Sequence, residues 1–401
     1  MHGAAATPEI ILDALITERK SLNNVEMIHL HTHGSARYAD YPEFRVTNLF
    51  VGENLRKKLD YDRVDYLPCF LSEIPGLFRR RVRAPDVAIV QVSSPDAKGY
   101  CSLGTSIDVA RAAVESASIV LGQVNPEMPR THGDGLIHLK QFTSIWEHRA
   151  PLLATQSKIP NATEKKIAEH VATLVENGST LQMGIGAIPD AVWASLTDRK
   201  NLGVHTEMFS DGLLPLLECG AVDNSKKTFH AGKTVTSFVN GTDALFRYVH
   251  DNPSILFLES DYVNRAENIA RNPKVMAINS AVEVDLTGQV AADSIGCRII
   301  SGVGGQMDFV RGASQSEGGK AVIALQSRTR SGRSRIVSML LPGAGVVTTR
   351  AHVHFIVTEY GIADLYGRTL GERAKALIAI AHPEDRESLA RSWFERDKLA
   401  P

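Results

Sequence analysis

The sequence has few cysteines, and their spacing excludes the common cysteine-based sites. Its 401 residues include only Cys69, Cys101, Cys219 and Cys297, which are far apart and form no CxxC pair. Isolated cysteines are typical of reduced thiols in a cytosolic protein, not of a disulfide framework or a zinc site. We therefore expect free thiols and a cytoplasmic location.

Long apolar runs are absent as well. No run approaches the roughly 20 residues that a membrane-spanning helix needs. The first twenty residues carry Glu9 and Asp13 among apolar ones, so they lack the basic region and apolar core of a secretory signal. These absences predict a soluble protein that has no membrane partner.

Net charge is close to zero, at −1, which removes overall basicity as an argument for nucleic-acid binding. Two local basic runs remain, RRRVR (79–83) and SRTRSGRSR (327–335). Neither is interleaved with aromatic residues, as a single-strand-binding surface would be. We interpret them as solvated charges or as contacts for a nucleotide phosphate, and expect no nucleic-acid partner.

Several catalytic motifs are missing. Without a GxSxG elbow, an α/β serine hydrolase would have no nucleophile. His29, His31 and His33 alternate in HLHTHG and could lie on one face of a strand, where histidines can bind a transition metal. No HxxxH, CxxC or HxxEH pattern completes such a site. Packed or exposed histidines are the favoured interpretation, and we expect no metal.

What is present indicates an enzyme-like α/β protein. The hydrophobic fraction of 43% and charged fraction of 22% are ordinary for a globular enzyme. The length exceeds the range in which one core keeps growing, which favours two domains. Short β-branched runs alternate with helical patterns, which predicts largely parallel strands. A long amphipathic helix from Thr163, with Asn161 or Thr163 as N-cap and Gly178 as C-cap, suggests domains of residues 1–157 and 158–401.

The pattern predicts strands and helices over most of the chain. Expected strands cover residues 87–92, 118–124, 179–183, 201–205, 275–279, 320–325, 335–340 and 354–359. Expected helices cover residues 106–117, 163–178, 188–196, 213–222 and 370–381.

Three glycine-rich loops stand out. GIGAIPDA (184–191) follows a predicted strand and opens a helix, so its first amides can point at an anionic group. SGVGGQMDFVRGA (301–313) shows no hydrophobic periodicity and reads as a hairpin turn or a backbone-lined ligand site. LPGAGVVTT (341–349) is a third such loop. Together they suggest one large ligand held partly by main-chain groups.

Glu207 lies 21 residues after Gly186, and this spacing has two interpretations. In a dinucleotide-binding unit, an acidic residue at this distance from the glycine turn holds a ribose hydroxyl. Pro189 stands where that fingerprint has its third glycine. Alternatively, a carboxylate opposite a cradle of backbone amides is what an acyl-transfer nucleophile needs. The spacing alone leaves both open.

Longer segments resemble a known family. Seven of them occur in the order seen in the acetyl-CoA hydrolase/transferase family: SSPDAKGYCSLG, GQVNPEMPRTHGD, TLQMGIGAIPDAV, HTEMFSDG, AINSAVEVDLTGQVAADSIG, SGVGGQMDFVRGA and VTEYGIADLYGRTLGERAKALIAIAHPEDRE. The chain is most similar to the branch with 4-hydroxybutyrate, butyrate and itaconate CoA-transferases, from about Ser93 onward. It departs from the family at Gln326, where a proline is common, and near Met1, where the family has a further stretch with a first strand.

The resemblance implies a fold and a site. The fold would be two open α/β domains of the CoA-transferase (NagB/RpiA-like) type, with the active site in the interdomain cleft. Glu207 would be the nucleophile, with Glu283 and Glu359 as rival carboxylates. The implied CoA and oxyanion contacts are Gln182, Met183, Gly184, Ile185, Gly186, Gly304, Gly305 and, as a further candidate, Lys320.

The implied activity is transfer of CoA from an acyl-CoA, such as acetyl-CoA, to a small acid such as 4-hydroxybutyrate, butyrate or itaconate, through a glutamyl-CoA thioester. CoA would be a co-substrate, with no permanently bound cofactor, and the chain would form a homodimer or higher homo-oligomer. A CoA thioester hydrolase would use the same nucleophile. More distant alternatives are an NAD-dependent oxidoreductase built on Glu207, a metal-dependent hydrolase built on the three histidines, and an inactive binding protein.

Overall fold

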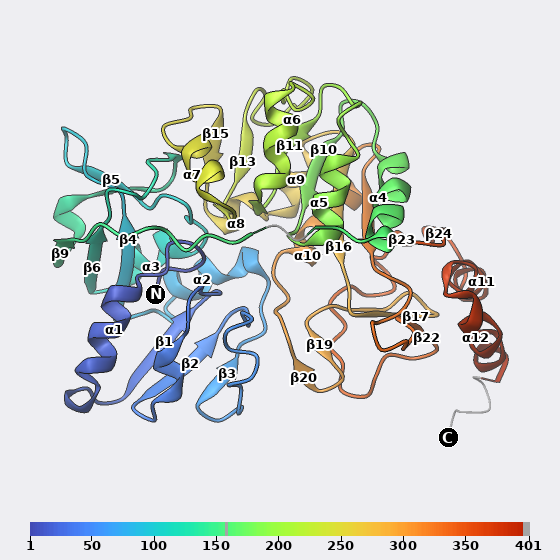
Figure 1. Ribbon diagram of the computed structural model, residues 1–401, viewed down its shortest axis with the longest axis horizontal. Coiled ribbons are helices and arrows are strands. Elements are labelled where there is room, and N and C mark those ends of the chain that lie inside the picture. Colours follow the sequence, from blue (N-terminus) through green and yellow to red (C-terminus); the bar gives the residue numbers. More distant parts are fainter. Residues whose placement is uncertain (157–158, 396–401) are drawn as a thin grey trace.

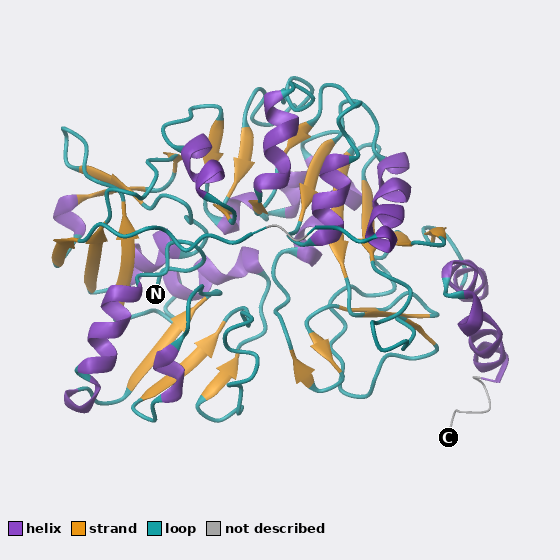
Figure 2. Cartoon of the chain, viewed as in Figure 1, coloured by secondary structure: helices purple, strands orange, loops and turns teal. Residues whose placement is uncertain are grey.

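The computed structural model describes residues 1–156 and 159–395, so the expected domain boundary between residues 157 and 158 lies outside the described residues. Figure 1 shows the N-terminal half of the chain, in blue and teal, beside the C-terminal half in green to red, and Figure 2 shows strands and helices mixed in both. The four cysteines are free. Among the described residues, no helix is long and apolar enough to cross a membrane.

The N-terminal half contains two three-stranded parallel sheets and one antiparallel pair. The first sheet is β1 (Val25–His29), β2 (Phe44–Asn48) and β3 (Val64–Tyr66); the second is β4 (Val87–Val92), β6 (Ile119–Val124) and β9 (Ser144–Glu147). The antiparallel pair is β5 (Tyr100–Ser102) with β8 (Leu136–His138). The helices here are α1 (Glu9–Thr17), α2 (Ile74–Arg79), preceded by the 3₁₀ turn η3 (Leu71–Glu73), and α3 (Ala110–Ser116).

The C-terminal half is organised around a six-stranded sheet in the order β11-β10-β16-β21-β23-β24. Its strands are β11 (Gly203–Val204), β10 (Thr180–Met183), β16 (Val275–Ser280), β21 (Lys320–Ala324), β23 (Phe355–Thr358) and β24 (Gly361–Asp364). All neighbours pair in parallel except β23 and β24. The parallel strands bring the loops after β10, β16 and β21 to one edge. The predicted parallel α/β arrangement is therefore confirmed for this sheet.

Helices and short strands complete this half. The helices are α4 (Ala162–Leu174), α5 (Ala187–Ala194), α6 (Leu214–Glu218), α7 (Asp243–Val249), α8 (Ser260–Val263), α9 (Ala266–Ala270), α10 (Gln306–Gln315), α11 (Leu370–Ile380) and α12 (Pro383–Glu395). The short strands are β12 (Met208–Phe209), β13 (Thr234–Thr236), β14 (Phe238–Val239), β15 (Ile255–Phe257), β17 (Glu283–Asp285), β18 (Val290–Ala291), β19 (Ser294–Ile295), β20 (Arg298–Ile299) and β22 (Ile336–Val337). β15 also pairs with β7 (His132–Gly133) from the first half.

Helix α10 corrects the interpretation of residues 301–313 as a turn without periodicity. Seven of its ten residues are buried, on more than one face. Its three exposed residues, Arg311, Ser314 and Gln315, share one face at helical spacing, so the segment does have an amphipathic period. The buried polar residues Gln306 and Asp308 obscure that period in the sequence. The glycine cluster is therefore the entrance to a helix.

Helix α4 starts where the sequence predicts and ends one turn early. Asn161 is the N-cap: its side chain accepts from the Glu164 amide, and the Glu164 carboxylate accepts from the Asn161 amide. The predicted C-cap, Gly178, is wrong, because Val175 is already extended. The Arg199 guanidinium donates to the carbonyls of Ala172 and Val175, so a distant cation satisfies the helix end.

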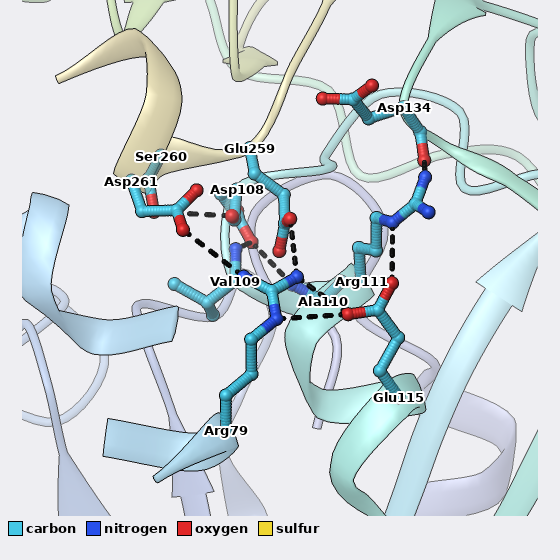
Figure 3. Close-up of polar contacts among 10 residues, drawn as sticks. All are labelled: Arg79, Asp108, Val109, Ala110, Arg111, Glu115, Asp134, Glu259, Ser260 and Asp261. Atoms are coloured by element: carbon cyan, nitrogen blue, oxygen red, sulfur yellow. Dashed lines mark hydrogen bonds and ion pairs between the residues drawn. The ribbon is translucent and has the colours of Figure 1, made fainter. Parts of the chain in front are cut away.

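The two halves share one hydrophobic core and an ionic clasp. The largest buried cluster includes Val90 and Val124 from the first half and Leu181 and Val357 from the second. Figure 3 shows the clasp, in which the Arg79 guanidinium at the end of α2 reaches carboxylates at the start of α8. Its contacts are 2.6 Å to Glu259 and 3.2 Å to Asp261.

The clasp extends within the N-terminal half. Arg79 also lies 2.7 Å from Glu115 on α3, and the Ser260 amide donates to the Asp108 carbonyl at 3.0 Å (Figure 3). Charged side chains that are partly removed from water need partners of opposite charge, and each side chain of the clasp has one. Helix α8 is thereby fixed against the N-terminal half by both side-chain and main-chain contacts.

Replacing the α4 N-cap should destabilise the fold without touching the site. Asn161→Ala removes the acceptor for the Glu164 amide, and we expect the free energy of unfolding to fall by about 1 kcal/mol. Thr163→Ala is the matched control and should cost less than about 0.5 kcal/mol, because Thr163 is not the cap. Urea denaturation of both variants measures this, and equal losses would contradict the assignment.

Candidate active site

Glu207 is placed by main-chain hydrogen bonds between β11 and β12. Its carbonyl accepts from the amides of Ser237 and Phe238 at 2.9 and 3.1 Å, and from Thr236 Oγ1 at 3.2 Å. The preceding residue, Thr206, donates its Oγ1 to the Met183 carbonyl at the end of β10 at 3.4 Å. Glu207 therefore lies beside the edge of the sheet from which the glycine turn emerges.

Two nitrogen donors hold the Glu207 carboxylate. Asn264 Nδ2, just after α8, donates to Oε2 at 3.0 Å. The Gly305 amide, at the start of α10, also hydrogen-bonds the carboxylate. A Cβ on residue 305 would lie 1.9 Å from Glu207 Oε2 and 2.1 Å from Asn264 Nδ2. Only glycine lets this backbone amide approach so closely.

The surroundings make this carboxylate more basic than an ordinary glutamate. Burial raises the pKa of Glu207, and the hydrogen bonds from Asn264 and Gly305 offset only part of that shift. The side chain is partly buried, so one face stays accessible. A desolvated but reachable carboxylate with two donors suits a nucleophile whose oxygens need support as charge moves.

Asp308, on the first turn of α10, is the second carboxylate of the cluster. It accepts from the Ser72 amide at 3.2 Å, from Ser72 Oγ at 2.8 Å and from Asn264 Nδ2 at 3.3 Å. Burial, with a smaller contribution from the nearby charge of Glu207, raises the pKa of Asp308 to about 7, although the hydrogen bonds from Ser72 and Asn264 oppose the shift. Because Ser72 belongs to η3 of the N-terminal half, this carboxylate joins the two halves at the site.

A cavity of about 450 Å³ adjoins the cluster. Its lining includes Phe70 from the N-terminal half, Val303 and Met307 from the C-terminal half, and the polar Asp308 and Arg311. Ligand sites in enzymes usually combine an apolar wall with a few polar groups at this size. Space for a small-molecule substrate therefore lies against the Asp308 side of the cluster.

The glycine turn after β10 borders a second cavity, of about 340 Å³. A Cβ on Gly184 would meet nothing within 4 Å, and the Ile185 side chain is half exposed. Gly186 has φ of 122° and is the N-cap of α5, without a side-chain cap. The first amides of α5 are thus open to a ligand in a cavity that Glu164, Arg330 and Arg335 also line.

The other residues predicted to contact CoA lie in or beside the six-stranded sheet, and most of them contact neighbouring protein groups. The Gln182 carboxamide exchanges hydrogen bonds of 3.3 and 3.1 Å with Asn279 on β16, and Met183 is buried. Lys320 begins β21, whose far end adjoins the glycine turn, and its ammonium lies 2.8 Å from Glu176 Oε1. Gly304, with φ of 58°, supplies the bend before Gly305.

The two rival carboxylates, Glu283 and Glu359, accept hydrogen bonds from loop residues. Glu283 accepts from the Leu341 amide at 2.7 Å, and Glu359 accepts from the amide and Oγ of Ser327 at 2.9 and 2.6 Å. Neither has the paired amide donors that surround Glu207.

The three histidines do not converge on one point. His29 Nε2 hydrogen-bonds the Tyr38 hydroxyl at 2.9 Å, while His31 and His33 lie beyond β1 with ring centroids 5.6 Å apart. Within residues 1–156 and 159–395, no group of three His, Cys, Asp or Glu side chains could hold a metal ion.

Sequence reasoning did not find Asn264, Asp308 or Ser72. Asn264 lies in an ordinary polar segment, 57 positions after Glu207, and Ser72 belongs to no motif that was singled out. Asp308 had one available signal, since it is an acidic residue between apolar ones three positions after a glycine pair. That signal has meaning only when the segment is known to be a buried helix.

Comparison with known proteins identifies a family for both halves of the chain. Residues 1–155 match the acetyl-CoA hydrolase/transferase N-terminal domain, and residues 241–393 match the corresponding C-terminal domain. The chain is 48% identical to a succinyl-CoA:acetate/propanoyl-CoA:succinate CoA transferase of Fasciola hepatica, over 100% of this chain and 85% of that protein. It is 46% identical to a 4-hydroxybutyrate coenzyme A transferase of Clostridium kluyveri, over 98% and 92%.

The structures also agree. The crystal structure of a 4-hydroxybutyrate CoA-transferase from Porphyromonas gingivalis superposes with a TM-score of 0.84 at 38% identity, covering 98% of this chain and 92% of that one. The predicted CoA-transferase type of α/β fold is therefore confirmed.

The raised pKa of Asp308 should make stability depend on pH in a defined direction. Between its ordinary value of 3.8 and about 7, the folded state binds this proton more tightly than the unfolded state. The contribution is fully present below 3.8 and is lost as pH rises through 7. We expect the native protein to lose stability relative to Asp308→Asn across this window, by at most about 1.4 kcal/mol per pH unit. Denaturation from pH 4 to 8 measures it, and a constant difference would contradict it.

Proposed function

Because this chain belongs to the acetyl-CoA hydrolase/transferase family, we propose that it transfers CoA from a short-chain acyl-CoA to a small carboxylic acid, with Glu207 as nucleophile. The observation that carries the proposal is the Glu207 carboxylate, held by Asn264 Nδ2 and the Gly305 amide. Asp308, which shares the Asn264 donor, lines the neighbouring cavity. We assign the reaction to the junction of domains formed by residues 1–157 and 158–401.

The first half-reaction transfers CoA to the enzyme. A Glu207 oxygen attacks the thioester carbonyl, the C–S bond breaks, and CoA leaves as a thiolate. The acyl group is now bonded to the Glu207 oxygen as a mixed anhydride. The thiolate then attacks the Glu207 carbonyl. The anhydride bond breaks, the donor acid leaves as a carboxylate, and a glutamyl-CoA thioester remains.

The second half-reaction is the same sequence in reverse with a different acid. The acceptor carboxylate attacks the glutamyl carbonyl and expels the CoA thiolate, giving a new mixed anhydride. The thiolate attacks the acyl carbonyl, so the new acyl-CoA departs and the Glu207 carboxylate is restored. No net proton is consumed, and ping-pong kinetics follow.

The two donors support the steps in which the Glu207 carbonyl is itself attacked. In those two steps the tetrahedral oxyanion forms on Glu207, where Asn264 Nδ2 and the Gly305 amide already donate. Losing one preorganised donor typically slows such reactions on the order of a hundredfold or more. Burial adds basicity to the attacking oxygen.

The glycine turn is our proposed contact for CoA. Gly184, Ile185 and Gly186 present backbone groups to a cavity that also contains Arg330 and Arg335, and CoA carries phosphates that such groups bind. Lys320 is less suited, because its ammonium is paired with Glu176. We propose acids in the size range of acetate, succinate, butyrate, itaconate and 4-hydroxybutyrate, a cytoplasmic location and a homo-oligomeric state.

Covalent trapping tests the nucleophile. Native protein incubated with an acyl-CoA and then borohydride should carry a reduced modification on Glu207, located by mass spectrometry. Glu207→Gln should not carry the modification, and its rate of CoA transfer should fall at least about a thousandfold. Glu207→Asp should be nearly as slow, because the carboxylate withdraws by one methylene.

Glu359→Gln is the matched control, since its carboxylate holds only Ser327, and it should still be trapped on Glu207. Trapping on another residue would overturn the assignment. Release of free thiol at an equal rate without an acceptor acid would identify a thioester hydrolase with the same nucleophile.

A methyl group on the glycine turn tests the CoA contact. Gly184→Ala should leave stability unchanged, because the added carbon meets nothing within 4 Å. It should raise KM for the acyl-CoA roughly tenfold if CoA lies against this backbone, which corresponds to about 1.4 kcal/mol. Gly371→Ala, where a Cβ also meets nothing, is the control and should leave KM unchanged. Equal KM values in both variants would place CoA elsewhere.

A further inference from the structure

The Asn264 carboxamide lies between the two carboxylates of the site. Its Nδ2 is 3.0 Å from Glu207 Oε2 and 3.3 Å from Asp308 Oδ2. An amide nitrogen carries two hydrogens, so each carboxylate can accept one. On the other side of the same group, Oδ1 is buried and has no hydrogen-bond partner among the described residues. The orientation of Asn264 is therefore set on its nitrogen side alone.

A carboxamide can rotate by half a turn with almost no change in shape. In the rotated form, Oδ1 would face Glu207 and Asp308, and an ionised carboxylate has no hydrogen to donate to it. Two acceptors would then face a third in a partly buried site, where unpaired polar groups are costly. Each carboxylate therefore disfavours the rotated form.

Glu207 cannot perform this role throughout the reaction. In the mixed anhydride and in the glutamyl-CoA thioester, the Glu207 carboxyl group is covalently bonded and carries no charge. It is then a weaker acceptor for Asn264. Asp308 takes no part in those bonds and stays unchanged. During the intermediates, Asp308 alone among the groups that contact Asn264 Nδ2 keeps a carboxylate against it.

Asp308 is itself fixed from the N-terminal half. Ser72 donates both its amide, at 3.2 Å, and its Oγ, at 2.8 Å, to the Asp308 carboxylate. Asp308 is buried on α10, the helix whose N-cap is Gly305. One short helix thus carries both the donor that contacts Glu207 directly and the acceptor that orients the second donor.

We propose that Asp308 is a positioning residue for the transfer reaction, which keeps the Asn264 amide nitrogen directed at Glu207 while Glu207 is acylated. Ser72 couples this orientation to the N-terminal half. The inference rests on the proposed function of Glu207 and adds a residue that acts on the reaction through Asn264.

A double-mutant cycle separates positioning from a structural role. At pH 8, above the pKa of Asp308, Asp308→Asn should lower kcat roughly ten- to a hundredfold and leave KM for the acyl-CoA within about twofold. An asparagine at 308 can donate as well as accept, so it no longer dictates the orientation of Asn264. In the Asn264→Ala background, the same change should have almost no further effect, because Asp308 acts through Asn264.

Ser72→Ala provides a second, milder variant with the same logic. It removes the Oγ donor but leaves the Ser72 amide, so kcat should fall only a few-fold, and again not in the Asn264→Ala background. Thermal melting of every variant checks that it folds. Should Asp308→Asn fail to fold, Ser72→Ala with and without Asn264→Ala completes the cycle.

Each outcome bears on one claim. Equal losses of kcat from Asp308→Asn in both backgrounds, or full activity of Asp308→Asn, would overturn the positioning role. Full transfer by Glu207→Gln in the same assay would instead overturn the proposed nucleophile. An inactive Glu207→Gln beside a fully active Asp308→Asn would leave the proposed function intact and remove only this inference.

Discussion

The structure depends on one constraint: a carboxylate must be kept partly out of water and still be reachable by substrate. Glu207 meets it through two nitrogen donors, the Asn264 carboxamide and the Gly305 amide. Removing a carboxylate from water without such donors would simply protonate it. The glycine at 305 follows from this constraint, because any side chain there would collide with the carboxylate.

Much of the surrounding fold serves to bring those donors together. Asn264 follows α8, which the Arg79 clasp and the Asp108 carbonyl hold against the N-terminal half (Figure 3). Gly305 is the N-cap of α10, and Asp308 on that helix is fixed by Ser72. The active site is consequently a property of the interface between the halves, in agreement with a hydrophobic core that extends through both.

The sequence supported a good part of this description. Strands such as β4, β6 and β16 are apolar runs with clear boundaries, and the capping box of α4 is visible in its letters. Glu207 and the glycine pair at 304–305 were within reach because family motifs surround them. The role of α10 was not, because the buried polar residues Gln306 and Asp308 interrupt the apolar side of its helical pattern. The same holds for the end of α4, which a distant arginine satisfies.

By itself, therefore, the sequence determined the α/β class and the family, and it singled out Glu207 as the proposed nucleophile. These are carried by local pattern and by contiguous motifs. Only the tertiary structure decided which residues support that attack, since Ser72, Asn264 and Asp308 are separated from Glu207 by between 57 and 135 positions. A hydrogen bond acts over about 3 Å, and no local pattern records which distant donors folding brings within that distance.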